Sequence, residues 1–207
     1  MRFLPNFWVR LAGAAVSGLL LLAGCYLPTR FTADITLNEA GDWTLAFGGE
    51  IASAALTPGL MPDRPTPAQL EERVKNVTND LSRDPGFRDV TYRGNGRFTV
   101  AYERGGNIFR QPGITFIRTD SRILQISYIK KDNEITIKGN TVPNAQRGWV
   151  REAGIDMNGD LRVTTALPVK DHNANATQPG PGGATVYTWA IRGLDQPAPR
   201  LVVAVPE

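Results

Sequence analysis

The sequence has very few of the residues that build metal centres and disulfide frameworks. It contains one cysteine and one histidine among 207 residues. One cysteine excludes an internal disulfide. Together the two residues cannot form a thiolate-rich zinc or iron–sulfur site or a multi-histidine metal centre. We therefore expect no metal and no cofactor.

Long hydrophobic runs are also scarce. The main one, Leu11–Cys25, follows Arg2 and Arg10 in a leading segment that has no acidic residue. At about 15 residues it is shorter than the roughly 20 that a membrane-spanning helix needs. A short basic segment followed by an apolar segment that ends in small residues is the arrangement of a signal peptide. The sequence therefore predicts that residues 1–24 are a leader that is cleaved.

The end of this leader carries a more specific motif, Leu22-Ala23-Gly24-Cys25. A leucine and two small residues before a cysteine resemble the lipobox of bacterial lipoproteins. The resemblance implies cleavage before Cys25 and transfer of a diacylglyceryl group to its thiol. Each buried methylene contributes about 0.8 kcal/mol, so two or three acyl chains hold a protein at a membrane without a spanning helix. The alternative is an ordinary secretory signal in which a cysteine happens to follow Ala-Gly.

The residue after Cys25 bears on which membrane would hold the protein. An aspartate there resembles the inner-membrane retention signal of enterobacteria, whereas this sequence has Tyr26. For a Gram-negative source this favours the outer membrane, and the choice between inner and outer membrane stays open. In either case we expect residues 25–207 to form an extracytoplasmic domain that faces the periplasm or the exterior.

Charge is unevenly distributed along the chain. Without residues 1–24 the net charge falls from +3 to about +1, so a global attraction to nucleic acid loses its support. Residues 83–151 nevertheless hold 13 basic and 6 acidic residues. Guanidinium and ammonium groups suit phosphates and other anions. The candidate contacts for an anionic ligand are Arg93, Arg97, Lys130 and Lys131. The alternative is a solvated basic face balanced by acidic flanks.

Alternating apolar and polar residues predict most of the strands. The pattern covers 31–37 and 43–51, joined by a short turn-rich loop, and 98–102 after the turn Gly94-Asn95-Gly96. A further hairpin is expected from 123–129 and 134–138. Additional strands are expected at 161–167, 184–192 and 201–205. The dipeptide Asn158-Gly159 is typical of a hairpin turn.

One helix is predicted with clear start and stop signals. Thr66 is a suitable N-cap, Pro67 fits the first helical position, and Gln69 would complete a capping box. Leu70, Val74, Val77 and Leu81 then mark one apolar face up to residue 82. One such helix can cover a sheet but cannot build a bundle. We therefore predict an α+β fold, with a mostly antiparallel, curved sheet and one main amphipathic helix packed on it. A subdomain boundary near residues 150–155 is left open.

Three segments of the mature chain resemble the LppM-like domain family of bacterial lipoproteins. They are 31–37, 164–174 and 184–191, the last bearing Trp189. The resemblance implies an extracytoplasmic α+β domain that meets lipids or glycolipids and has no family-wide catalytic role. Many members carry a C-terminal transmembrane helix. Residues 184–207 depart from that pattern because they include Arg192, Asp195 and Arg200.

No complete catalytic or metal-binding motif is evident in the sequence. Asp156, Asn158 and Asp160 alternate as in a calcium loop, but Leu161 and Leu167 stand where glycine and glutamate are needed. We therefore interpret this segment as a hairpin turn.

The remaining candidates for chemistry lie between residues 171 and 183. His172 is the one imidazole that could act as a general base, and no Gly-x-Ser-x-Gly or Ser-x-x-Lys motif accompanies it. Gly180-Pro-Gly-Gly183 contains a proline and lacks the residues that complete a phosphate loop. We interpret the whole segment as a polar loop.

These observations favour a membrane-anchored lipoprotein whose domain binds an envelope component without catalysis. The expected partners are the membrane itself, through the anchor, and a lipid, a glycolipid or an envelope protein. Nucleic acid is not expected. A periplasmic hydrolase that uses two carboxylates or an unmarked serine is the first alternative, and a structural or assembly lipoprotein is the second.

Overall fold

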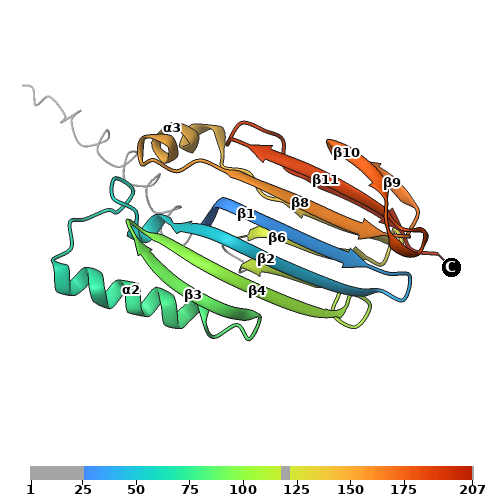
Figure 1. The fold of residues 1–207 in the computed structure, drawn as a ribbon, viewed down its shortest axis with the longest axis horizontal. Coiled ribbons are helices and arrows are strands. Elements are labelled where there is room, and N and C mark those ends of the chain that lie inside the picture. Colours follow the sequence, from blue (N-terminus) through green and yellow to red (C-terminus); the bar gives the residue numbers. More distant parts are fainter. Residues whose placement is uncertain (1–25, 118–121, 207) are drawn as a thin grey trace, which may run out of the picture.

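The computed structural model describes residues 26–117 and 122–206, in which two β-sheets lie face to face (Figure 1). The larger sheet has seven strands in the order β10-β11-β8-β1-β2-β4-β3. These are β1 (Tyr26–Leu37), β2 (Asp42–Ser53), β3 (Phe87–Gly94), β4 (Arg97–Asn107), β8 (Asn158–Thr165), β10 (Ala176–Pro179) and β11 (Thr185–Arg192).

The smaller sheet has five strands in the order β5-β6-β7-β12-β9. These are β5 (Gly113–Ile117), β6 (Arg122–Ile129), β7 (Glu134–Gly139), β9 (Val169–His172) and β12 (Arg200–Ala204). The helices are α2 (Pro67–Leu81), α3 (Asn144–Glu152) and the short 3₁₀ segments η2 (Ala54–Leu56) and η3 (Pro181–Gly183). Almost every strand pair is antiparallel, so the predicted α+β class is confirmed.

The core lies between the two sheets and is rich in aromatic rings. Phe47 of β2 stacks on Phe31 of β1 at 5.4 Å and contacts Phe116 of β5 at 4.8 Å between ring centroids. Tyr102 of β4 lies 4.5 Å from the Phe116 ring. Each such pair contributes about 0.5–1.5 kcal/mol beyond the burial of its area. The alternation seen in the sequence places these rings inward, and it thereby fixes which face of each strand is buried.

Helix α2 forms as the sequence predicts. The Thr66 side chain accepts a hydrogen bond from the Gln69 backbone N–H, and the Gln69 side chain accepts one from the Thr66 backbone N–H, which completes the capping box. Leu81 is fully buried at the C-terminal end, and Val74 and Val77 pack against the main core. The helix therefore covers the β3 side of the larger sheet (Figure 1).

The assignment of strands to two sheets is the main feature that local patterns did not predict. The chain passes through the smaller sheet after β4 and returns to the larger one as β8, which pairs with β1 in parallel. Each sheet contains strands from before and from after residues 150–155 in the chain. In the larger sheet, β8 and β11 join the strands that include β1, and in the smaller sheet β12 pairs with β7.

The prediction of a hairpin turn at Asn158-Gly159 was wrong, because both residues belong to β8. Gly159 lies opposite Phe31 in the parallel pair. A Cβ atom at this position would approach the Phe31 ring and the Phe31 carbonyl oxygen to 2.5 Å. The glycine is therefore required by close packing within a strand, which is the other common use of glycine in sheets.

Helix α3 and its small core were also missed. Val150 is fully buried with Val142, Ile155 and Leu194, and Leu27 of β1 packs against this cluster. Helix α3 therefore lies at the end of the molecule where β1 begins (Figure 1). We call this the proximal end, which also includes the turn at residues 94–96 and the loop at 57–66. The distal end is formed by the β1–β2 turn.

Residues 171–183 were expected to be a loop, and the structure corrects this. They include the end of β9, all of β10 and the 3₁₀ segment η3. Strand β9 pairs with β12, and β10 pairs with β11. Side chains in β10 are exposed throughout, so backbone pairing rather than apolar burial forms this edge, and an apolar pattern could not reveal it.

Candidate functional site: an arginine-lined cleft

The outer face of the larger sheet carries a row of cross-strand ion pairs. Arg192 of β11 pairs with Asp160 of β8 at 2.8 Å, and Arg162 of β8 donates two hydrogen bonds to Asp34 of β1 at 2.6 and 2.9 Å. The row continues from β1 to β2 and β4 through one shared carboxylate, Glu50. Because outward side chains on neighbouring strands lie side by side, the register of the sheet sets these pairs.

Glu50 is the most buried charged residue of this row. Its Oε1 accepts hydrogen bonds from Thr29 Oγ1 at 2.6 Å and from Arg97 Nη1 at 2.9 Å, and its Oε2 accepts one from Arg30 Nη2 at 3.3 Å. Burial alone would raise the pKa of the Glu50 carboxyl. The hydrogen bonds from Thr29, Arg97 and Arg30 outweigh burial, so the pKa lies below its ordinary value. Glu50 is therefore a fixed negative charge between two arginines.

The three partners of Glu50 also line a cleft of about 560 Å³, which we call the arginine cleft. The side chains that define its chemistry are Arg30, Arg97, Arg192, Thr29, Asp156 and Asn158. The three guanidinium groups come from β1, β4 and β11, and the sheet register brings them to one place near the start of β1. Their N–H groups can bind a phosphate or carboxylate through paired hydrogen bonds.

Two of the three arginines are held rigidly by backbone carbonyl groups. Arg97 Nη2 donates to the Gly154 carbonyl at 2.7 Å, and Arg192 Nη1 donates to the Gly159 and Ile191 carbonyls at 2.7 and 2.8 Å. Arg30 is different, because its side chain is 77% exposed and bonds to Glu50 through one nitrogen. Since acidic partners already balance much of the charge, the cleft offers directed donors rather than a large positive field.

The structure separates the residues that the sequence analysis grouped as anion contacts. Arg97 lines the arginine cleft, and Arg93 lies nearby on β3 with its Nε donating to Thr99 Oγ1 at 3.0 Å. Lys130 and Lys131 lie in the β6–β7 turn at the distal end, next to Tyr128, whose ring contacts Phe109 beyond the far end of β4. The length of β4, roughly 30 Å, thus separates the lysines from Arg97.

The sequence pointed to Arg97 but not to Arg30 and Arg192, which also line the cleft, nor to Glu50, which binds Arg30 and Arg97. These residues lie outside the basic segment at 83–151. They meet because β1, β2, β4, β8 and β11 are neighbours in one sheet. One signal in the sequence could have revealed the Arg30–Glu50 pair. The two residues face outward on neighbouring strands of a correctly predicted hairpin, and opposite charges in such positions can pair.

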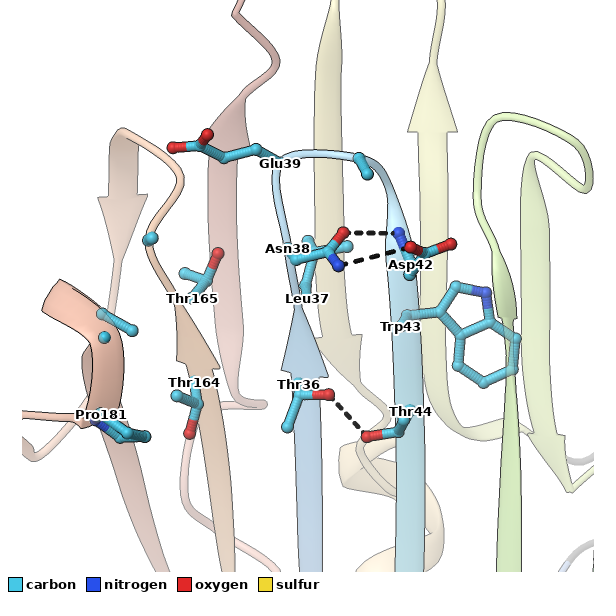
Figure 2. A pocket seen from close by; sticks show the side chains of 14 residues that line it. Thr36, Leu37, Asn38, Glu39, Asp42, Trp43, Thr44, Thr164, Thr165 and Pro181 are labelled. Carbon is cyan, nitrogen blue, oxygen red and sulfur yellow. Dashed lines mark hydrogen bonds between the residues drawn. The ribbon is translucent and has the colours of Figure 1, made fainter.

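A second cleft, of about 630 Å³, lies at the distal end beside the β1–β2 turn (Figure 2). Thr36 and Thr44 hydrogen-bond across the two strands at 2.6 Å, and Thr164 lies on the neighbouring strand. Asn38 Oδ1 accepts a hydrogen bond from the Asp42 backbone N–H at 2.9 Å. The polar groups here mainly bind one another and close the turn, so we favour the arginine cleft as the functional site.

The pKa shifts of three carboxyl groups, one of them in this second cleft, bear on the hydrolase alternative. Hydrogen bonds from Asn107 and Asn38 lower the pKa of the Asp42 carboxyl. The pKa values of Glu50 and Asp63 are lowered as well. A glycosidase needs a carboxyl group with a raised pKa to act as the general acid. These three carboxyl groups shift in the opposite direction.

The remaining sequence candidates have structural partners. Asp156 Oδ1 accepts hydrogen bonds from the backbone N–H groups of Met157 and Leu194. His172 contacts the Tyr187 ring at 5.0 Å, and its Nδ1 accepts from the Ala174 N–H. Within residues 26–117 and 122–206, no cluster of three histidine, cysteine or acidic residues is suited to hold a metal ion.

The predicted anchor motif, Leu22, Ala23, Gly24 and Cys25, lies outside the described residues. Tyr26, the residue that follows it, lies in β1, where it is buried and pairs with Ser53. In the part of the chain that the structure describes, no helix has both the length and the apolar character needed to cross a bilayer.

Fold and site together define an α+β domain of two facing sheets with an arginine-lined cleft on the outer face of the larger one. No family model matches the sequence, and no curated protein matches it. The NMR structure of the folded domain of LppM from Mycobacterium tuberculosis is similar to this chain with a TM-score of 0.40 and 15% identity. The similarity covers 88% of this chain and 93% of that chain. This neighbour bears the name of the family that the sequence resembles.

Proposed function

We propose that this chain is a bacterial lipoprotein, anchored through Cys25, whose domain is a non-catalytic binding module of the cell envelope. The observation that carries the proposal is that the one cysteine of the chain completes the motif Leu22-Ala23-Gly24-Cys25 after a signal-peptide-like segment. Tyr26, the residue directly after the motif, already lies within β1. In this proposal no flexible linker separates the lipid anchor from the folded domain.

The domain's ligand in this proposal is an envelope component with an anionic group, such as a lipid, a glycolipid or a protein carboxylate. Arg97 and Arg192 are held in place before a ligand arrives, which reduces the entropy lost on binding. Arg30 can rotate onto the ligand because its side chain is mostly exposed. In this account the cleft binds and orients the anion, and no bond of the ligand is broken.

The anchor is tested by fractionation of cells that express the wild-type chain or Cys25→Ser. The proposal expects the wild-type protein to sediment with membranes and to be released by detergent but not by high salt. The serine variant cannot form the thioether, so its processed lipid-bound form should be lost. Equal release of both proteins by salt or carbonate would contradict the anchor.

The binding part is tested by copurification from detergent-extracted membranes. Mass spectrometry would compare the phosphate- or carboxylate-bearing molecules retained by wild-type protein, by Arg30→Ala and by Arg162→Ala. Arg162 is a matched control because it is an exposed, paired arginine on the same sheet face that does not line the cleft. We expect retention to fall severalfold for Arg30→Ala alone. The same loss in both variants, or no retained molecule in wild type, would contradict a specific cleft.

A further inference from the structure

The proximal end joins the anchor to the folded domain without a linker. Tyr26 is buried in β1, its neighbour Leu27 packs against the cluster around Val150 of α3, and Cys25 directly precedes Tyr26. Flexible linkers let an anchored domain tumble away from the membrane, since their reach grows with their length. With no intervening residue, an acylated Cys25 holds the proximal end within a few ångströms of the bilayer surface.

Exposed residues at this end suit a bilayer interface. Trp149 of α3 is 47% exposed and is the most exposed of the large hydrophobic side chains in the described residues. Its helix neighbours Ala145 and Gly148 are also exposed and have small side chains. Tryptophan is enriched at membrane interfaces because its ring is apolar and its N–H is polar.

Helix α3 presents this tryptophan from a rigid base. Val150, the residue after Trp149, is fully buried. The backbone N–H of Ile155 donates a hydrogen bond to the Val150 carbonyl at 3.1 Å. Arg147 and Arg151 both pair with Asp195 in the loop before β12. The helix is thereby fixed to the domain, so the position of the indole follows the orientation of the whole domain.

Basic groups at the same end favour an acidic membrane surface. Arg93 precedes the turn at residues 94–96 and Arg64 lies in the loop before α2, and both side chains are exposed. Within the described residues neither forms an ion pair, so both remain available to headgroup phosphates. The start of the arginine cleft is close as well, because Arg30 lies four residues after Tyr26, about 13 Å along an extended strand.

We propose that the proximal end docks on the acidic phospholipid bilayer that holds the anchor, with Trp149 in the headgroup region and the arginine cleft beside the membrane surface. This inference rests on the proposed lipidation of Cys25. It goes further, because it fixes the orientation of the domain and names headgroup phosphates as the anions nearest to the cleft. The distal end, with Phe109 and Ile129, then faces away from the membrane.

The test uses the purified acylated protein in vesicles of phosphatidylethanolamine and phosphatidylglycerol that contain brominated lipid. Bromine quenches tryptophan only at close range. Trp43 and Trp189 are buried, so Trp149 is the exposed reporter of the described domain. Trp149→Phe supplies the background. The matched control is Trp149→Phe/Ile129→Trp, which moves the reporter to an exposed position at the distal end.

We expect brominated lipid to remove most of the Trp149 emission and to leave the reporter at position 129 unchanged. Equal quenching of both reporters, or of neither, would overturn the docked orientation. Protection of Trp149 from aqueous iodide without bromine quenching would also overturn it, since a second copy or another protein would then cover α3. Measurement of the intact mass distinguishes failure of the anchor from failure of the docking. An unacylated protein would overturn both hypotheses. An acylated protein whose Trp149 is not quenched would overturn the docking alone.

Discussion

Arg97 of β4 donates to Glu50 of β2 at 2.9 Å and, through its other terminal nitrogen, to the Gly154 carbonyl at 2.7 Å. One guanidinium therefore ties the outer face of the sheet to the loop that follows α3. We expect Arg97→Ala to lower the free energy of unfolding by about 2 kcal/mol, because a charged hydrogen bond to a buried carboxylate is lost. Urea unfolding followed by tryptophan fluorescence measures this change.

Arg30→Ala is the matched control for that prediction. Arg30 also pairs with Glu50, but its side chain is 77% exposed, and exposed pairs contribute about 0–1 kcal/mol. The smaller loss expected for Arg30→Ala would show that burial, rather than charge pairing alone, makes Arg97 important. A larger loss for Arg30→Ala would contradict this description of the site.

The lowered pKa of Glu50 predicts a specific acid sensitivity. A carboxyl whose pKa is lower in the folded protein than its ordinary value of 4.5 stabilises the fold above that value. The contribution is lost as the pH falls through the lower, folded-state pKa. We therefore expect the unfolding free energy to fall less steeply below about pH 4.5 in Glu50→Gln than in wild type. Parallel pH profiles of the two proteins would show that Glu50 does not contribute.

Gly159 is predicted to be intolerant of even one methyl group. In Gly159→Ala the new Cβ would meet the Phe31 ring and carbonyl oxygen, which overpacks the core and costs about 1–3 kcal/mol. Gly48→Ala is the control, because a Cβ there would contact nothing within 4 Å. Thermal unfolding of both variants measures the difference. Equal melting temperatures would contradict the close approach of β8 to Phe31.

The capping box predicts the cost of losing one hydroxyl at the start of α2. Thr66→Ala removes the acceptor for the Gln69 N–H, which lowers stability by about 1 kcal/mol. Thr66→Ser retains the oxygen and should restore most of that stability. Chemical denaturation of the two variants gives the comparison. If serine fails to rescue the alanine loss, the hydroxyl is not the stabilising group.

Local signals were sufficient to predict the hairpins, helix α2 and the fold class. The β1–β2 hairpin and the capping box depend on neighbours in sequence, and both are present as expected. The parallel β1–β8 pair joins residues more than 100 positions apart, such as Arg30 and Asn158. The division into two sheets likewise depends on pairs between distant segments, such as β12 with β7. Alternation shows which residues face inward but not which strand lies alongside, so these features could not be predicted.

The candidate site illustrates the same limit. Composition identified Arg97 because it lies in a basic segment, and composition also selected Lys130 and Lys131, which the fold places at the distal end. Arg30 and Arg192 occur in segments where acidic residues outnumber basic ones. Only the sheet register brings them to Arg97. Helix α3 was missed for a related reason. It has nine residues, contains Gly148, and has no side-chain hydrogen bond at its N-cap residue, Pro143.

Mass spectrometry of the N-terminal tryptic peptide tests the central claim most directly. Trypsin cuts after Arg30, so the membrane-extracted protein should yield a peptide that begins at Cys25 and ends at Arg30. We predict that this peptide carries a diacylglyceryl thioether on Cys25, that the ester-linked chains are released by alkali, and that residues 1–24 are absent. An unmodified Cys25, or a mature N-terminus elsewhere, would contradict the account of this chain as an anchored envelope lipoprotein.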